Sequence, residues 1–190
     1  GGSIDMSSAG GSASYNLISG SGTDTLKGDA GDDTFTIAAT GEGNNDTFDG
    51  DGGNDTLQLS TGTHTLTDNS KVVNIETILA HSSGSTVDLT NQTEVFTITG
   101  GAGVDKIYAE GGLSSTIYGD SGDDILVGGA GKDAIQGGED NDDITGNAGD
   151  DDLAGHSGDD TISGGDGNDT ISGGAGIDTI SGGDGSDTIS

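Results

Sequence analysis

Single apolar residues recur along this chain at the centre of short segments that are otherwise polar. In the stretch 164–172, for example, Ile171 lies between Thr170 and Ser172, directly after a glycine-rich run of six residues. Because successive side chains of a strand face opposite sides, this triplet predicts a short strand with one inward-facing residue. Fourteen units of nine residues follow the same template, and the eighth position is apolar in all fourteen. The pattern predicts a core that is one residue wide.

The nonapeptide units are arranged in three blocks. The longest block fills 119–190 with eight units in register. Of the two shorter blocks, one holds 19–36 and 41–58, and the other holds 100–108 and 110–118. Self-similarity at a fixed short period is typical of solenoids. Two nonapeptides make one coil of eighteen residues, so we expect turns on the same side of the solenoid to lie eighteen residues apart.

The six-residue part of each unit has the composition of a cation-binding turn. Glycine at the first, second and fourth positions permits backbone conformations with positive φ. The sixth position is aspartate in thirteen of the fourteen units, and Ser115 is the exception. A carboxylate that follows several exposed peptide carbonyls offers hard oxygen ligands, of which Ca²⁺ takes six to eight. We therefore expect Ca²⁺ between stacked turns, with Asp124 paired with the turn that contains Asp142.

This unit resembles the Ca²⁺-binding nonapeptide G-G-x-G-x-D-x-U-x of the repeats-in-toxin (RTX) family. The resemblance implies an all-β fold, a right-handed parallel β-roll, with Ca²⁺ held in the turns by the sixth-position aspartate and by turn carbonyls of two stacked loops. The implied side-chain ligands are Asp24, Asp33, Asp46, Asp55, Asp105, Asp124, Asp133, Asp142, Asp151, Asp160, Asp169, Asp178 and Asp187. The implied carbonyl ligands include those of Gly128, Ala130, Gly146, Ala148, Gly164 and Asp166.

Some units depart from the family pattern. Asn44, Leu113 and Asp140 stand where the fourth-position glycine is expected. The unit 110–118 also has Ser115 in place of the aspartate, so we expect it to lack a normal calcium site.

The distribution of repeats divides the chain into three parts. We expect an N-terminal β-roll block at 1–58 with four repeats, an irregular β-solenoid connection at 59–99 without repeats, and a C-terminal β-roll block at 100–190 with ten repeats. The connection has two interpretations: looser coils of the same solenoid without calcium, or a small inserted β-domain. We favour the first, because about 41 residues scarcely suffice to bury a separate core.

The charge of the chain connects calcium to folding. The 34 acidic residues face four basic ones, for a formal net charge of −30, and only 27% of residues are hydrophobic. Such a composition is typical of disordered chains, which bury too little apolar surface to offset the entropy of ordering. We therefore expect the metal-free chain to be unfolded and the binding of Ca²⁺ to drive folding. Calcium modules outside cells bind with Kd of about 10⁻⁴ to 10⁻³ M, which predicts a chain that is exported unfolded and folds as a secreted or cell-surface protein.

Several functional classes are disfavoured by the same sequence. It contains no cysteine, no paired histidine spacing for zinc and no motif context for a Ser, His and Asp group, so we expect no catalytic centre and no cofactor other than Ca²⁺. The negative charge disfavours nucleic acid as a partner. Without a stretch of about 18 consecutive apolar residues, membrane insertion is not expected either.

Two functions remain open. The preferred one is a structural segment of a secreted adhesin, surface-layer or similar extracellular bacterial protein. The alternative is the calcium-dependent folding and secretion module of an extracellular enzyme, such as a protease, lipase or alginate epimerase. The chain looks excised from a larger protein, and Ser190 is the ninth position of a complete unit with no polar cap after it. An open coil edge invites pairing, so we expect self-association into a filament or lattice as a further possibility.

Overall fold

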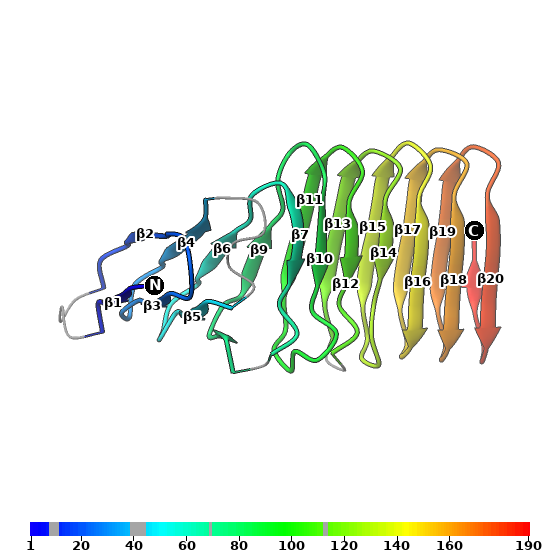
Figure 1. The fold of residues 1–190 in the computed structure, drawn as a ribbon. Helices are drawn as coiled ribbons and strands as arrows, with labels where there is room; N and C mark the ends of the chain where they lie inside the picture. The colour runs from blue at the N-terminus through cyan, green and yellow to red at the C-terminus, as the bar shows by residue number, and fades with distance from the viewer. Residues whose placement is uncertain (8–11, 39–44, 69, 112–113) are drawn as a thin grey trace.

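The protein is a row of stacked coils built from short strands and turns (Figure 1). The computed structural model describes residues 1–7, 12–38, 45–68, 70–111 and 114–190. These residues form strands, turns and bends and contain no helix. The N-terminus lies toward one end of the row and the C-terminus at the other (Figure 1).

The strands form three sheets in which every pairing is parallel. A four-stranded sheet has the order β1 (Ser3–Asp5), β3 (Thr25–Lys27), β5 (Thr47–Asp49), β8 (Val72–Val73). A seven-stranded sheet has the order β20 (Thr179–Asp184), β18 (Thr161–Asp166), β16 (Asp143–Ala148), β14 (Ile125–Val127), β12 (Lys106–Tyr108), β10 (Ser85–Asp88), β7 (Gly62–Thr65). The third, ten-stranded sheet has the order β2 (Asn16–Ser19), β4 (Thr34–Ile37), β6 (Thr56–Gln58), β9 (Thr77–Leu79), β11 (Thr97–Ala102), β13 (Thr116–Ser121), β15 (Ala134–Glu139), β17 (Asp152–Ser157), β19 (Thr170–Ala175), β21 (Thr188–Ile189).

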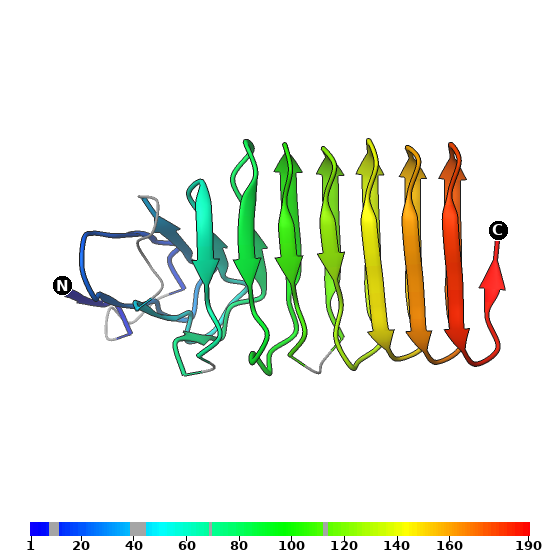
Figure 2. The same ribbon diagram turned by 45° about the vertical axis from the view of Figure 1, so that its right-hand side comes forward.

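These sheets confirm the prediction of an all-β, parallel β-roll. Along the chain, strands of the ten-stranded sheet alternate with strands of the other two sheets, so most coils contribute one strand to either side. The exception lies between β6 and β9, where β7 and β8 both belong to sheets other than the ten-stranded one. Figure 2 shows the result as an evenly spaced series of strands toward the C-terminus and a less regular arrangement toward the N-terminus.

The register between coils follows the repeat length. In the C-terminal run Asp143 pairs with Thr161, eighteen residues further on. In the N-terminal block Thr25 pairs with Thr47, a separation of 22 residues, because a spacer lengthens that coil. The eighteen-residue coil predicted from the nonapeptide is therefore confirmed where the units are contiguous, and an insertion lengthens a coil without breaking the ladder.

The core is a single file of side chains between the ten-stranded sheet on one side and the other two sheets on the other. The eighth-position residues that the structure buries are Leu26, Phe35, Phe48, Leu57, Ile107, Ile117, Leu126, Ile135, Ile144, Leu153, Ile162 and Ile171. Burying each such side chain stabilises the fold by about 1.5–3 kcal/mol. The rings of Phe35 and Phe48 also meet edge to face, with centroids 6.0 Å apart.

The connection 59–99 shares the sheets and the core of the two blocks. Its strand β9 pairs with β6 on one side and with β11 on the other, so the ten-stranded sheet passes through the connection without a break. Its side chains Leu66, Ile78 and Val87 belong to the same buried cluster as those of the repeats. One core position is polar, because His64 pairs with Val87 and is fully buried, and its Nε2 lies 2.8 Å from the carbonyl oxygen of Ser60. Burial lowers the pKa of His64.

Candidate metal centre

Most of the sixth-position aspartates are buried. Those that the structure buries are Asp24, Asp33, Asp46, Asp55, Asp105, Asp124, Asp133, Asp142, Asp151, Asp160 and Asp169. Asp178 and Asp187, in the last two turns, are half-buried. A buried carboxylate is costly unless it is paired or binds a metal, so the partners of each oxygen decide what these turns can do.

One carboxylate oxygen has a fixed structural partner. The backbone N–H of Asp124 donates to Oδ1 of Asp142 at 2.9 Å, and that of Asp142 donates to Oδ1 of Asp160 at 2.9 Å. On the opposite side the N–H of Asp133 donates to Oδ1 of Asp151 at 2.8 Å. The structure therefore brings Asp124 together with the turn of Asp142, eighteen residues away, in a ladder of hydrogen bonds between coils.

The other carboxylate oxygen is left without a hydrogen-bond partner in most turns. Buried Oδ2 atoms of this kind belong to Asp55, Asp105, Asp124, Asp142, Asp151, Asp160 and Asp169. Burial, with a smaller contribution from neighbouring carboxylates, raises the pKa of Asp124 to about 6 and that of Asp142 to about 7. These negative groups therefore need a cation, or a proton, to be stable in the fold.

Each of these Oδ2 atoms borders a small space beside the first-position glycine of its turn, and in several turns a peptide carbonyl oxygen of the next coil borders the same space. A Cβ atom added to Gly119 would meet Oδ2 of Asp124 and, at 2.6 Å, the carbonyl oxygen of Gly137 in the next coil. The same holds for Gly146, where Oδ2 of Asp151 and, at 2.7 Å, the carbonyl oxygen of Gly164 converge. Only glycine leaves this space open. A carboxylate from one turn and a peptide carbonyl from the next are the hard donors that Ca²⁺ binds, so these residues fit the ion.

The carbonyls implied by the family resemblance fall into two groups. Those at the first position, such as Gly146 and Gly164, border this space. The carbonyl of Gly128 accepts a hydrogen bond at 3.2 Å from the side-chain amide of Asn147. At the third position, the carbonyl of Asp166 accepts the N–H of Gly149 at 2.8 Å.

Ala130 and Ala148 are also third-position residues, and the binding of Ca²⁺ by their carbonyl oxygens stays a prediction. The oxygens nearest to a Cβ placed on Gly128 belong instead to Asp133 and Gly146.

In a second turn conformation, a backbone N–H of the same turn donates a hydrogen bond to Oδ2. The backbone N–H of the second turn residue donates to it in three turns, from Gly20 to Asp24, from Asp29 to Asp33 and from Gly129 to Asp133, at 2.9, 2.9 and 2.7 Å. The second residue has positive φ in the turns with an unpartnered Oδ2, as the non-glycine residues Asp51 (71°), Asp120 (75°), Asn147 (78°) and His156 (77°) show. The orientation of this peptide therefore decides whether Oδ2 is capped or left for a cation.

The departures from the repeat have visible consequences. Asp140 takes the left-handed conformation of the missing fourth-position glycine, with φ 77°. Ser115 is buried and its N–H donates to Oδ1 of Asp133 at 2.6 Å, but it supplies no carboxylate. That the unit 110–118 lacks a normal site stays a prediction. Asn44 and Leu113 lie outside the described residues.

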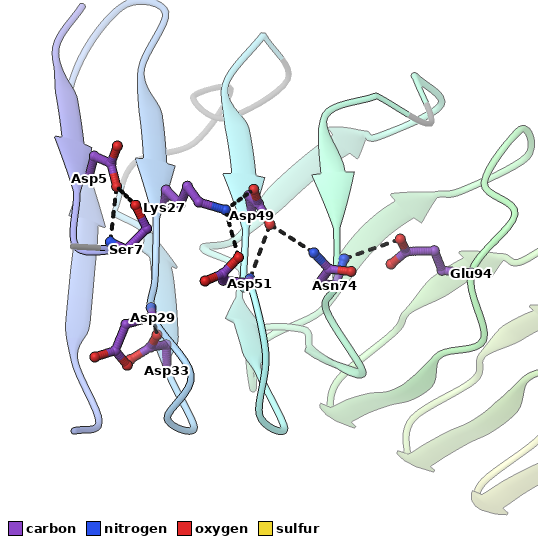
Figure 3. A network of polar contacts seen from close by, with 9 residues as sticks. All are labelled: Asp5, Ser7, Lys27, Asp29, Asp33, Asp49, Asp51, Asn74 and Glu94. Atoms are coloured by element: carbon purple, nitrogen blue, oxygen red, sulfur yellow. Dashed lines mark hydrogen bonds and ion pairs between the residues drawn. The ribbon is translucent and has the colours of Figure 1, made fainter. Parts of the chain in front are cut away.

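Two acidic residues that the nonapeptide pattern did not single out, Glu76 and Asp29, lie next to sixth-position aspartates. Glu76 accepts the N–H of Asp55 through Oε2 at 2.7 Å, as a sixth-position aspartate would. Its signal in the sequence is its place directly before the triplet Thr77-Ile78-Leu79. Asp29, at a second position, is 2% exposed and lies beside Asp33 (Figure 3).

The N-terminal block also carries a polar network on its outer surface (Figure 3). Lys27 Nζ bridges the carboxylates of Asp49 and Asp51. The bonds to these carboxylates raise the pKa of Lys27, and Asp49 further accepts the side-chain amide of Asn74 at 2.9 Å. This network is the one place among the described residues where a lysine is bonded to two carboxylates.

No group of three or more His, Cys, Asp or Glu side chains that could hold a metal ion occurs in the described parts of the chain. In turns such as those of Gly119, Gly146 and Gly164, the space instead combines one carboxylate with a peptide oxygen of the next coil. The described residues also include no helix that is long and apolar enough to cross a membrane.

Comparison with known proteins agrees with the geometry. The family model described as the RTX calcium-binding nonapeptide repeat matches residues 16–36, 39–58, 97–112 and, in overlapping stretches, 118–190. These matches cover about two thirds of the chain. A search of curated proteins gave no match. The chain therefore belongs to the family of RTX calcium-binding nonapeptide repeats, a β-solenoid that binds Ca²⁺ at multiple sites.

Proposed function

We propose that this chain is a calcium-binding structural module of a secreted or cell-surface bacterial protein, which is unfolded at low calcium and folds when Ca²⁺ binds outside the cell. The observation that carries the proposal is the series of buried Oδ2 atoms without a hydrogen-bond partner. In this proposal the thirteen sixth-position aspartates and the first-position carbonyls of the following coil hold the ions.

Electrostatics support the coupling between calcium and folding. The chain has a formal net charge of −30, and folding stacks buried carboxylates one coil apart. Each ionised carboxylate without a partner destabilises the fold, whereas a bound Ca²⁺ neutralises it and joins two turns. Anything that binds the folded state alone stabilises it in proportion to the logarithm of its concentration. Calcium would therefore act as the cross-link of a protein that contains no cysteine.

We further propose a scaffold, adhesin or surface-layer role rather than a module attached to an enzyme. In support, one core and one ten-stranded sheet run from β2 to β21, through the connection as well as the repeats. In this proposal 1–58 and 100–190 are the calcium-rich blocks of one rod and 59–99 joins them. A continuous rod of stacked coils suits a mechanical or assembling function.

Far-ultraviolet circular dichroism during a calcium titration tests the proposal, with magnesium as the control and light scattering recorded on the same sample. We expect a cooperative transition from coil to β-structure near millimolar Ca²⁺ that magnesium does not produce. Calcium-dependent scattering would support the assembling scaffold, and a calcium-bound monomer would favour the enzyme module. A β-spectrum that a chelator leaves unchanged would overturn calcium-coupled folding.

A further inference from the structure

The turn that joins β8 to β9 is a shortened relative of the repeat turns. Val72 pairs with Phe48 and Ile78 pairs with Leu57, so both flanking strands keep the frame of the preceding coil. Three residues, Asn74 to Glu76, therefore span the distance that six residues span in the turn 50–55. Asn74 takes the place of the first turn residue and Glu76 the place of the sixth.

Asn74 supplies the carbonyl that a first-position glycine supplies elsewhere. A Cβ added to Gly50 would meet the carbonyl oxygen of Asn74 and Oδ2 of Asp55. This arrangement matches the one at Gly119, where Oδ2 of Asp124 and the carbonyl of Gly137 converge. Asp55 is fully buried, and its Oδ2 has no hydrogen-bond partner. An isolated buried carboxylate oxygen thus faces a peptide oxygen from the connection.

The Asn74 carbonyl is held in this orientation from several sides. Asn74 has the left-handed φ of 53°. Its N–H donates to Oε1 of Glu94 at 3.1 Å, and its side-chain amide donates to Asp49 at 2.9 Å (Figure 3). Asparagine tolerates this conformation better than most residues because its short polar side chain bonds locally. The carbonyl is therefore positioned before any ion binds.

Glu76 closes the shortened turn. Its Oε2 accepts the N–H of Asp55 at 2.7 Å, the bond that Asp142 makes with the N–H of Asp124 in the repeats. Glutamate is one methylene longer than aspartate, which suits a turn that has three residues fewer. Its charge also lies next to Asp55, which increases the attraction for a divalent cation at that place.

We propose that one Ca²⁺ binds between the turn 50–55 and the turn Asn74 to Glu76, held by the Asp55 carboxylate and the Asn74 carbonyl, with Glu76 as a positioning residue. This inference rests on the proposed function, since it assigns half of a calcium site to the connection 59–99, where the nonapeptide pattern places none. The calcium-binding part of the N-terminal block then extends past residue 58 to residue 76.

The test compares variants of the shortened turn in the full chain. Glu76→Ala removes the bond to the N–H of Asp55, and Glu76→Gln keeps an acceptor there but removes the charge. Asn74→Val places a β-branched residue at positive φ and so displaces the carbonyl, whereas Asn74→Gly keeps both the conformation and the carbonyl. Glu110→Gln, at an exposed residue, is the control for the loss of one charge.

Native mass spectrometry at rising calcium counts the ions, and hydrogen exchange of 50–58 and 70–79 locates the effect. We expect Glu76→Ala to weaken one site by about 10- to 100-fold, the usual effect of losing an outer-shell partner. Asn74→Val should weaken the same site at least as much, because it displaces a carbonyl that contacts the ion directly. Glu76→Gln should weaken it less, and Asn74→Gly and Glu110→Gln should keep the full number of ions.

If Glu76→Ala and Asn74→Val bind as many ions as the original chain with unchanged exchange at 50–58, the inference is wrong while the proposed function stands. If the original chain itself binds no calcium, the proposed function fails first.

Discussion

The C-terminal run of eight units and the first two units of the N-terminal block, 19–36, carry the same template but complete most of their turns differently. In the run, strands such as β18 continue for six residues into the turn, and Oδ2 of Asp142, Asp151 and Asp160 has no hydrogen-bond partner. In the N-terminal block, β3 ends at Lys27, before the turn 28–33, and Oδ2 of Asp33 accepts the N–H of Asp29 in that turn. Oδ2 of Asp24 likewise accepts the N–H of Gly20.

A single backbone dihedral accounts for this difference. With positive φ at the second turn residue, Oδ2 has no hydrogen-bond partner, and in the C-terminal run the ladder also extends into such turns; otherwise the N–H of that residue caps Oδ2. The turn 50–55 has the same positive φ, although β5 ends at Asp49. Gly129 shows that the effect is local, because it caps Asp133 inside the otherwise open C-terminal run. The repeat therefore fixes the position of each carboxylate, and the orientation of the peptide at the second turn residue determines whether Oδ2 of that carboxylate is capped or left for a cation.

The largest expected difference between the two regions is the calcium concentration at which each becomes ordered. We expect 119–190 to gain hydrogen-exchange protection at about tenfold lower calcium than 19–36, because in that block an ion must displace hydrogen bonds to Asp24 and Asp33, each worth about 1.5–3 kcal/mol. Exchange measured peptide by peptide during a calcium titration checks this. If both regions gain protection at the same calcium concentration, the expected difference in their calcium affinity is wrong.

The pH dependence of the calcium-free protein should be nearly as large. The folded-state pKa is raised to about 6 for Asp151 and to about 7 for Asp142, mainly by burial. Above the ordinary pKa of about 4 the unfolded chain loses protons that the folded chain retains, so stability falls as pH rises from about 4 to 7.

In chelator we therefore expect more β-structure at pH 5 than at pH 8, by circular dichroism. Saturating calcium should reverse the order, since Ca²⁺ requires the ionised carboxylates. Chelated protein with equal β-content at both pH values would contradict the buried, unpartnered state of these oxygens.

Core substitutions compare the packing of the two regions. Phe48→Ala in the N-terminal block should cost roughly 3–5 kcal/mol and Ile144→Ala in the run roughly 2–5 kcal/mol, because both side chains are fully buried. Ile177→Ala is the control: at 81% exposure it should change stability by less than about 0.5 kcal/mol. Urea unfolding in saturating calcium measures all three. A cost for Ile177→Ala near that of Ile144→Ala would show that the single-file core is not the source of stability.

A smaller effect than that of the core substitutions Phe48→Ala and Ile144→Ala should come from removing one charge at an open turn and at a capped turn. Asp142→Asn keeps an acceptor for the N–H of Asp124 but removes the proposed calcium ligand, which should cost about 1–3 kcal/mol when calcium is 10- to 100-fold above Kd. Asp33→Asn should cost less than about 1 kcal/mol in the same calcium, because Oδ2 of Asp33 already accepts the N–H of Asp29. Equal losses would show that capping does not affect the ion.

Most of the fold could be predicted from the periodicity of the sequence, as particular residues show. Because Ile144 and Ile162 recur at a fixed spacing, the sequence determines both the inward face and the eighteen-residue register. The pairing of Asp124 with the turn of Asp142 follows from the same spacing. The thirteen aspartates could be placed in turns from the sequence, but their ligand role remains a proposal.

What could not be predicted depends on local backbone geometry and on contacts between coils. Nothing in the residue types of Gly129 and Gly138 separates a capping peptide from one with positive φ, since both are glycine. The shortened turn at Asn74 breaks the period, so Glu76 is aligned with the aspartates only by the pairing of β8 and β9. The buried His64 is likewise visible only from its pairing with Val87.

Because the core is a single file of side chains, the number of coils in the rod can change while the architecture stays the same. In a globular protein the interior has a centre, and removing an element leaves a hole around which the remainder must rearrange. Here each coil covers only the coil before and the coil after it, so stability is close to a sum of neighbour terms. Coils can be added, lost or, as at the connection 59–99, rewritten without disturbing the geometry farther along. A gene that encodes such a rod can change its reach simply by changing the number of repeats.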